Sequence, residues 1–367
     1  MTINNEHNKL NVPNLRFPEF SEEWETVFLG DIVKSISSGK TKSSEGEYNL
    51  YGSTGIIGRT QMPDYKGEML LIARVGANAG YLQLINEQCG ITDNTLIVVP
   101  RDVPTKYLYY FLQHFNLNRL IFGSGQPLIT GGMLKKIKVQ IGTKKEQDKI
   151  SNFLSLLDER IVTQNKIIDR LQSLIKGIVD CTILRKGKNA IVGDVCSISE
   201  QIRAEANIDD IITVRLHGNG VCKSSAENLQ LGATQYYRRR AGQLIYGKQN
   251  FHNGAIGIVP ISLDNGITSK DIPSFDIDEM KCNSVYLLAQ LQSPQYYKPA
   301  EALTTGTGSK RLKEETFLKM PIVLPNKREQ DNIAVLIHRA SMNLDHAKRL
   351  LELLSIQKQF LLRQMFI

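Results

Sequence analysis

The stretch KKEQDKI at residues 144–150 decides the fold, because the chain repeats it as KREQDNI at residues 327–333. The second copy lies 183 residues after the first in a chain of 367. At this fixed offset the similarity continues without a gap from Gly123 to Ile178 of the first copy. A match of that length in one register indicates an internal duplication.

Each copy opens a long apolar periodicity. Apolar residues recur at alternating spacings of four and three, which is typical of a coiled-coil seam. We therefore predict helices over residues 144–184 and 327–366 that pack antiparallel on each other. The expected seam contains Leu157, Ile161, Ile168, Leu171, Leu344, Leu351 and Leu354, and it is interrupted by Gln164, Ala347 and Lys358.

The start of each helix carries a capping signal. Thr143 and Asn326 stand three residues before Glu146 and Glu329, which is the spacing of a capping box. This pattern favours a structural role for the two glutamates, with contact to a partner chain as the alternative. The candidates for such partner contact are Glu146, Gln147, Glu329 and Gln330.

The segments that precede the helices are rich in Gly, Asn, Ser, Thr and β-branched residues, and they predict short strands, turns and a few small helices. Each segment opens with a similar phrase and contains one short amphipathic helix. The matching pairs are LGDIV (29–33) with VGDVC (192–196), and KYLYYFLQH (106–114) with VYLLAQLQS (285–293).

The expected fold class is therefore α+β. Two mixed α/β domains are separated by two long antiparallel coiled-coil helices, with an internal pseudo-twofold repeat. We assign the domains to residues 1–143 and 187–326, and the helical segments to residues 144–186 and 327–367.

Composition bounds the classes of function. Apolar content of 41% and charged content of 22% indicate a globular protein, and a net charge of +8 favours a polyanionic partner. The chain has no apolar run long enough to span a membrane and no signal peptide, so we expect a cytoplasmic protein. Its five widely spaced cysteines form no CxxC pair, which argues against a zinc site or a disulfide framework.

No motif supports catalysis or a metal centre. The basic stretch SSGKTKS (37–43) lacks the first glycine of a P-loop, because position 34 is Lys, although its lysines suit phosphate contact. The histidines form no HxH or HExxH pair, and Glu279-Met280-Lys281 has no well-placed Pro-Asp before it. We expect no catalytic residue, no metal ligand and no cofactor in this chain.

On these features the chain resembles the DNA-specificity subunits of Type I restriction-modification enzymes. The resemblance rests on the two copies quoted above and spans almost the whole chain. It also rests on LRFPEFSEEWE (15–25), FLSLLDERIVTQNKIIDRLQSLIKGI (153–178) and RLLELLSIQKQFLLRQMFI (349–367).

The resemblance implies two target recognition domains, each reading one half of a split, asymmetric DNA site. It also implies that the helices dock two methyltransferase subunits, which in turn recruit the restriction subunits, in a system of defence against foreign DNA. S-adenosylmethionine, ATP and Mg are then expected on those partner subunits, and no membrane is involved.

Candidate DNA contacts come from comparing equivalent positions of the two halves. Arg and Lys suit guanine, and Asn and Gln suit adenine. For each residue, a solvated loop side chain is the alternative reading. The candidates of the first half are Lys40, Lys42, Arg74, Asn78, Thr92, Asn94, Ser124 and Gln126. Those of the second half are Arg238, Lys248, Asn250, His252, Asn253, Ser269, Lys270, Thr307, Ser309, Lys310 and Arg311.

Three classes of function remain open from the sequence. A DNA-reading scaffold explains why two domains with the same arrangement of elements carry different polar side chains at equivalent positions. A nuclease or methyltransferase would show turnover by the pure chain. A purely structural coiled-coil adaptor would bind no DNA and leaves those differences unexplained.

Overall fold

A computed structural model of the protein describes residues 11–121, 125–184, 187–224, 234–306 and 310–367, with only the backbone of Leu184. The chain divides into two compact units. Unit 1 runs to Asn165 and includes Arg349–Ile367, whereas unit 2 comprises Lys166–Lys348. Each unit therefore contains a part of both long helices. The division into four consecutive segments stays a prediction.

Unit 1 is built around a six-stranded sheet of order β2-β7-β5-β6-β3-β4, with a separate antiparallel pair β1-β8. Strands β3 and β6 pair in parallel. The strands are β1 (Glu25–Phe28), β2 (Val33–Ser38), β3 (Tyr48–Gly52), β4 (Gly55–Thr60), β5 (Tyr65–Ala73), β6 (Leu82–Ile91), β7 (Thr95–Pro100) and β8 (Lys138–Ile141). The helices are α1 (Leu29–Ile32), α2 (Thr105–Phe115), η1 (Leu117–Leu120) and α3 (Gly131–Lys135).

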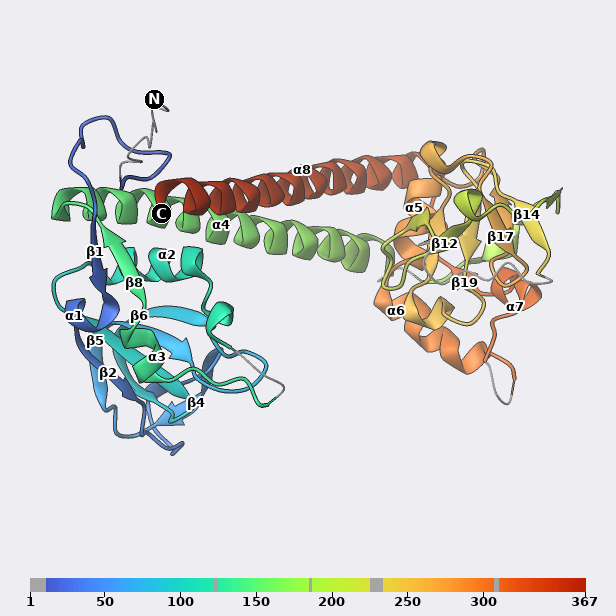
Figure 1. The fold of residues 1–367 in the computed structure, drawn as a ribbon. Coiled ribbons are helices and arrows are strands. Elements are labelled where there is room, and N and C mark those ends of the chain that lie inside the picture. The colour runs from blue at the N-terminus through green and yellow to red at the C-terminus, as the bar shows by residue number, and fades with distance from the viewer. Residues whose placement is uncertain (1–10, 122–124, 185–186, 225–233, 307–309) are drawn as a thin grey trace, which may run out of the picture. The chain divides into compact units, whose positions relative to one another are not determined.

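The central strand β5 is apolar on both faces. Leu70 and Ile72 belong to the main core with α2, whereas Met69 and Leu71 belong to a second core on the other face of the sheet. Strand β5 is therefore covered on both sides. Figure 1 shows α2 lying between this sheet and the first part of α4 (Lys144–Val179).

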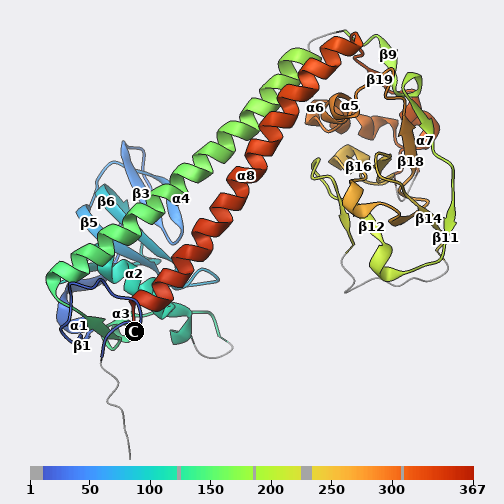
Figure 2. The same cartoon turned by 90° about the horizontal axis from the view of Figure 1, so that it is seen from above.

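Unit 2 has smaller sheets, namely β10-β18-β15-β16, β11-β14-β17, β12-β13 and β19-β9. Its first strands are β9 (Ala190–Ile191), β10 (Cys196–Ile198), β11 (Arg203–Ala204), β12 (Ile212–Val214), β13 (Val221–Lys223) and β14 (Tyr236–Arg238). The others are β15 (Leu244–Tyr246), β16 (Ile256–Ile258), β17 (Ile267–Ser269), β18 (Ser274–Ile277) and β19 (Pro321–Ile322). Figure 2 shows β9 and β19 at one end of this unit and β11 and β14 at the other.

In unit 2, as in unit 1, short helices precede one long helix. The short helices are η3 (Val192–Asp194), η4 (Ile208–Asp210), η6 (Phe251–Asn253), η7 (Ile261–Leu263), α5 (Ser284–Leu291), α6 (Pro294–Tyr297), η8 (Lys298–Leu303) and α7 (Glu314–Leu318). Then α8 (Lys327–Met365) follows, as α4 follows the first domain. Central strand β15 again splits its side chains between two cores, with Tyr246 on the α5 side and Ile245 on the other.

Hydrogen bonds at matching positions establish the pseudo-repeat. The Tyr107 hydroxyl donates to the Gln140 carbonyl at 2.8 Å, and the Tyr286 hydroxyl donates to the Val323 carbonyl at 3.0 Å. The acceptors lie 183 residues apart, whereas the tyrosines of α2 and α5 lie 179 apart. The two domains thus share one backbone arrangement, and small insertions separate the matching positions.

The long helices start where the sequence predicts. The Thr143 hydroxyl accepts from the backbone N–H of Glu146, and the Asn326 side chain accepts from that of Glu329. Helix α4 continues as a π-helical segment over Asp180–Leu184, so the first long helix reaches its predicted end.

The predicted seam is buried within each unit. In unit 1 the first part of α4 faces the last part of α8, where Lys358 and Asp158 form an ion pair at 2.6 Å. In unit 2 the last part of α4 faces the first part of α8, and Val179 and Ile337 share one core. The helices therefore run antiparallel as predicted. All predicted seam residues and their three interruptions are buried or half-buried.

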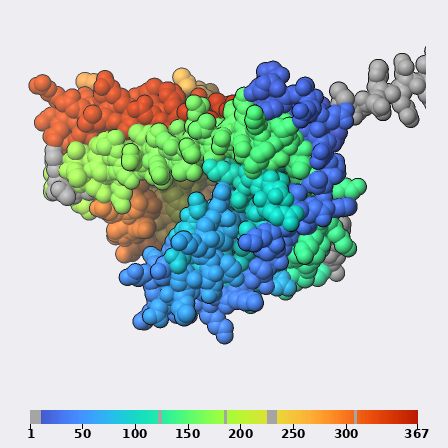
Figure 3. Space-filling model, turned by 90° about the vertical axis from the view of Figure 1, so that its left-hand side faces the viewer, coloured from blue at the N-terminus to red at the C-terminus, as the bar shows by residue number. Residues whose placement is uncertain are grey.

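Residues from both ends of the described chain pack in unit 1. The backbone N–H of Leu15 donates to the Gln364 carbonyl at 2.8 Å, and Phe366 packs against Trp24 and Tyr107. The residues after position 10 also lie along the start of α4, as Figure 3 shows. The equivalent of Phe366 in unit 2 is Ile183, which is fully buried in that unit's core.

Within the described ranges, none of the helices has the length and apolar character that crossing a membrane requires. Those same residues include no group of three or more His, Cys, Asp or Glu side chains that could hold a metal ion.

Candidate nucleic-acid interface

Three turns of unit 1 meet at one end of the large sheet. The backbone N–H of Arg74 donates to the Asn94 carbonyl at 2.9 Å, and the Arg74 carbonyl accepts from Ile129 at 2.8 Å. Gly76 donates to Pro127 at 3.0 Å. Main-chain bonds therefore bring the predicted residues after β5, after β6 and after position 125 to a single surface.

The side chains on this surface differ in exposure. Asn78, Asn94 and Gln126 are exposed, whereas Arg74 and Thr92 are half-buried. The Arg74 Nε is buried and has no hydrogen-bond partner among the described residues. A buried donor without an acceptor costs free energy. A ligand that brings an oxygen or nitrogen acceptor to Arg74 Nε would therefore be stabilised by a new hydrogen bond.

The basic loop after β2 borders the same turns. Gly39 donates to the Thr95 carbonyl and Thr41 donates to the Ile91 carbonyl, which fixes the loop beside the β6–β7 connection. Thr41 is buried, whereas its neighbours Lys40 and Lys42 are exposed. Both lysines can therefore reach a phosphate without any change in the backbone.

Unit 2 repeats this frame with other side chains. Lys248 donates its backbone N–H to the Asp271 carbonyl at 2.8 Å, and its carbonyl accepts from Leu312 at 2.9 Å. Lys248 therefore occupies the position of Arg74. Asp271 likewise matches Asn94, and Leu312 matches Ile129 at the offset of 183.

The cations of the second surface are paired with carboxylates. Lys248 contacts Glu314 at 2.7 Å, and the two Nη atoms of Arg311 face the two oxygens of Asp271 at 3.3 Å each. Lys310 donates to Glu301 at 3.1 Å, and this bond lowers the pKa of the Glu301 carboxyl. The three carboxylates Asp271, Glu301 and Glu314 were not among the predicted site residues.

Lys248 and Arg311 also line a hollow of about 730 Å³, together with Thr305, Gly306, Lys313 and Glu314. The hollow contains three basic side chains and one acidic side chain among these lining residues. The excess of basic over acidic side chains suits contact with a phosphate or a base edge.

The turn after Lys248 carries three further candidates. Asn250 is exposed and accepts from the Asn253 side-chain amide at 3.2 Å. His252 is half-buried, and its Nδ1 has no hydrogen-bond partner among the described residues. Ser269 and Lys270 lie at the end of β17, where Lys270 is exposed.

The arginine run of unit 2 divides into two roles. Arg238 and Arg240 are exposed, but Arg239 is fully buried and donates to Thr268, Ser274 and the Ile272 carbonyl. Burial lowers the pKa of Arg239 to about 10. Arg239 therefore adds no charge to the surface, and its side chain joins the strands from within the core.

Three of the four residues predicted to contact a partner are buried. The Glu146 carboxylate accepts from Arg16 at 2.7 and 2.8 Å and from the Trp24 indole at 3.0 Å. The Gln147 amide donates to the Gly142 carbonyl, and the Gln330 amide donates to the Pro325 carbonyl. Glu329 is half-buried. These positions favour the structural role, which the capping signal also favoured, over the alternative of partner contact. The Glu146 carboxylate, however, bonds Arg16 and Trp24 rather than the start of its own helix.

Ser124, Thr307 and Ser309 lie outside the described residues. The other candidate DNA contacts gather at the turns of their own unit, apart from Arg238 and Ser269, which end β14 and β17.

Comparison with known proteins shows which proteins these domains resemble. The model of the Type I restriction modification DNA specificity domain matches residues 21–173. The MjaVIII specificity subunit of Methanocaldococcus jannaschii is 23% identical, covering 91% of this chain and 89% of its own. The chain is similar to the specificity subunits of Type I restriction-modification systems.

Two further similarities agree with this family. The EcoprrI specificity subunit of Escherichia coli is 29% identical over 39% of this chain and 38% of its own length. The crystal structure of the S subunit from M. genitalium has a TM-score of 0.70 at 15% identity, covering 97% of this chain and 99% of that one. The fold of this chain is therefore that of an S subunit.

Proposed function

We propose that each unit of this specificity subunit reads one half of a bipartite, asymmetric DNA target. The observation that carries the proposal is the shared frame around Arg74 and Lys248. The same main-chain bonds hold both positions, while the side chains offered there differ. One frame with two sets of polar groups is what two readers of different half-sites require.

In this proposal, base reading falls to the polar residues on the turns. Arg74, Asn78, Asn94 and Gln126 serve one half-site, and Arg311 with the residues around Lys248 serves the other. Thr92, Asn250, His252, Asn253, Ser269, Lys270 and Lys310 join them as base or backbone contacts. Lys40, Lys42 and Arg238 contact phosphates, which position the protein without reading sequence.

We further propose that the exposed faces of α4 and α8 dock the methyltransferase subunits. Both helices keep large apolar side chains in solvent, which include Phe153, Leu156, Leu174, Leu336, Leu353 and Phe360. Apolar side chains exposed in a row mark a surface for protein partners. S-adenosylmethionine, ATP and Mg would then bind the partner subunits, and the assembly would serve in defence against foreign DNA.

The test exchanges one reading domain. Residues 189–325 are replaced by the equivalent segment of a relative, and residues 144–184 and 327–367 are kept. The hybrid should assemble with methyltransferase subunits, keep the half-site read by residues 24–142 and exchange the other. Methylome sequencing of the host measures both half-sites. A swap that alters both half-sites, or neither, contradicts two independent readers.

A further inference from the structure

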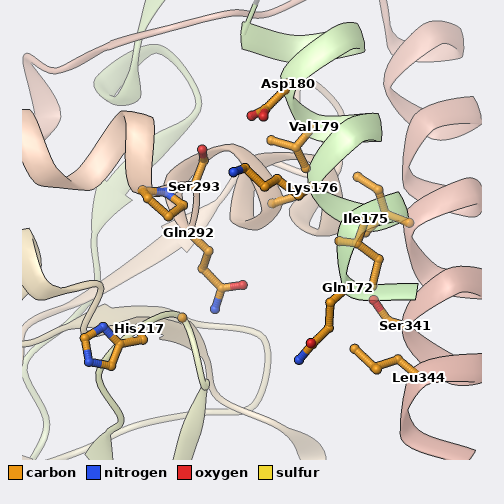
Figure 4. Close-up of a pocket in the computed structure, with 14 residues that line it drawn as sticks. Gln172, Ile175, Lys176, Val179, Asp180, His217, Gln292, Ser293, Ser341 and Leu344 are labelled. Atoms are coloured by element: carbon orange, nitrogen blue, oxygen red, sulfur yellow. The ribbon is translucent and has the colours of Figure 1, made fainter. Parts of the chain in front are cut away.

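Unit 2 contains a cavity of about 270 Å³ where α4, α5 and α8 meet. Ile175 and Val179 come from α4, Ile337 and Leu344 from α8, and Ala289 from α5. Figure 4 shows Ser341 beside this apolar wall and Gln292 extending into the space between His217 and Gln172. The helices thus supply an apolar wall, and they also contribute the polar or charged side chains of Gln172, Lys176 and Asp180 to the lining.

The cavity exists because of one difference between the halves. Helices α2 and α5 match at an offset of 179, as their tyrosines Tyr107 and Tyr286 establish. At this offset Ala289 occupies the position of Tyr110. An alanine in place of a tyrosine removes a whole phenol ring from the junction of the three helices.

In unit 1 that ring fills the equivalent junction. The Tyr110 hydroxyl donates to Asp158 at 2.9 Å, and the Lys358 ammonium lies 5.6 Å from the ring centroid. At the offset of 183 the equivalent of Asp158 is Ser341, and that of Lys358 is Ile175. Unit 2 thus keeps a hydroxyl acceptor where the phenol oxygen would lie and has an apolar side chain in place of the ammonium.

We propose that this cavity is a binding site for a single-ring aromatic group that carries a hydroxyl. The ring lies against Ile175, Ala289 and Ile337, and its hydroxyl donates to Ser341 Oγ. Size agrees with this assignment, because an apolar cavity of roughly 150 Å³ is enough to hold benzene. The inference does not depend on DNA reading or on the docking of methyltransferase subunits.

The probe is p-cresol, titrated into the full chain and followed by isothermal calorimetry and by ligand-observed NMR. Wild type should bind one equivalent with a Kd of about 1 mM or tighter, the range of a fragment of this size. Ala289→Tyr should weaken binding by at least about tenfold, because the new ring occupies the site. Saturable binding that is unchanged in this variant, or no binding to wild type, overturns the proposal.

Three further variants guard against a folding artefact. Ala289→Leu fills the cavity with a smaller side chain and should also weaken p-cresol. Tyr110→Ala should create a second equivalent site in unit 1, so the stoichiometry doubles while the first site is unchanged. Ser341→Ala should weaken p-cresol several-fold but leave toluene unaffected, because only the phenol loses a hydrogen-bond partner. An equal effect on both probes overturns the assigned orientation.

The phenol could be free or belong to a tyrosine of another protein, and N-acetyl-tyrosinamide separates these sources. It carries the same ring on a peptide backbone. Affinity equal to that of p-cresol means that the mouth of the cavity admits a protein side chain. Affinity at least tenfold weaker assigns the site to a small free phenol.

Discussion

Pro104 and Asn283 occupy equivalent places before α2 and α5, and only Asn283 donates a backbone N–H to the glutamine beneath it. That bond joins Asn283 to Gln330 Oε1 at 2.9 Å. Proline has no N–H to offer. The Oε1 atom of Gln147, the equivalent glutamine, is accordingly buried with no hydrogen-bond partner among the described residues.

This difference predicts unequal costs for the same substitution. Gln330→Met should destabilise the protein by about 3 kcal/mol, since Asn283 N–H and the Lys281 and Pro325 carbonyls all lose their partner. Gln147→Met should cost less than about 1 kcal/mol, because it removes an unsatisfied oxygen along with one bond. Urea unfolding of the two variants measures the difference, and equal costs would contradict the explanation.

His114 should make stability depend on pH. Burial lowers the pKa of His114 below its ordinary value of 6.5, so the folded state binds the proton less readily than the unfolded state. Its contribution is complete above about pH 6.5 and is lost as the pH falls through the folded-state pKa. His114→Ser, which installs the residue found at the equivalent Ser293, should flatten the thermal stability profile between about pH 7 and 5. An unchanged dependence of the melting temperature on pH in this variant would contradict the prediction.

Adjacent arginines of unit 2 should behave differently. Arg239→Ala should destabilise the protein by about 3–5 kcal/mol, because the buried hydroxyl oxygens of Thr268 and Ser274 lose their charged donor. Arg238→Ala should change stability by less than about 0.5 kcal/mol, since its side chain is exposed. Thermal melts of the two variants measure these losses of stability. A similar loss in both would show that burial of the arginine does not determine the cost of its removal.

Base reading and phosphate contact should separate in unit 1. Arg74→Ala should cost about 1–3 kcal/mol of discrimination at one base pair. Lys42→Ala should instead weaken binding to all sequences alike and reduce the salt dependence by about one phosphate contact. Binding of the assembled complex to matched and single-mismatch DNA at several salt concentrations measures both. Uniform weakening by Arg74→Ala would remove it from the base readers.

Releasing the paired cations of unit 2 should strengthen general DNA affinity. Glu314→Gln removes the carboxylate that holds Lys248, and Asp271→Asn removes the one that holds Arg311. Each change should raise non-specific affinity by about threefold or more at low salt, because it adds one net positive charge to the surface. Asp148→Asn, on an exposed part of α4, serves as the control. A decrease in affinity would mean that the carboxylates themselves contact DNA.

The duplication made the helical frame predictable. A repeated string, an N-cap and a 3-4 spacing are local signals, and they located α4 and α8 within a few residues. The seam followed from the same spacing, since Leu157, Ile168 and Leu354 had to face a partner helix.

The sequence could not predict which charged residues are buried. Arg239 and Arg238 are adjacent in a basic run, and only the pairing of β14 with β11 and β17 turns one of them inward. Glu146 carries a capping signal, but Arg16 lies 130 residues away in sequence. Contacts between such distant residues depend on tertiary packing, which no local pattern records.

The carboxylates around Lys248 and Arg311 were missed for the same reason. Asp271, Glu301 and Glu314 come from three separate segments that only the shared frame brings together. A comparison of the halves could have suggested Asp271, because it stands where the first half has Asn94.

The burial of Leu361, Leu362 and Phe366 in the core of unit 1 bears on how the protein is made. A ribosome releases the chain from its N-terminus, and domains generally fold in that order. Here the first reading domain lacks part of its core until the end of α8 emerges, whereas Lys166–Lys348 can close earlier. The domain that is translated first is thus completed last, and its unfinished apolar surface must be kept from aggregating throughout synthesis of the second.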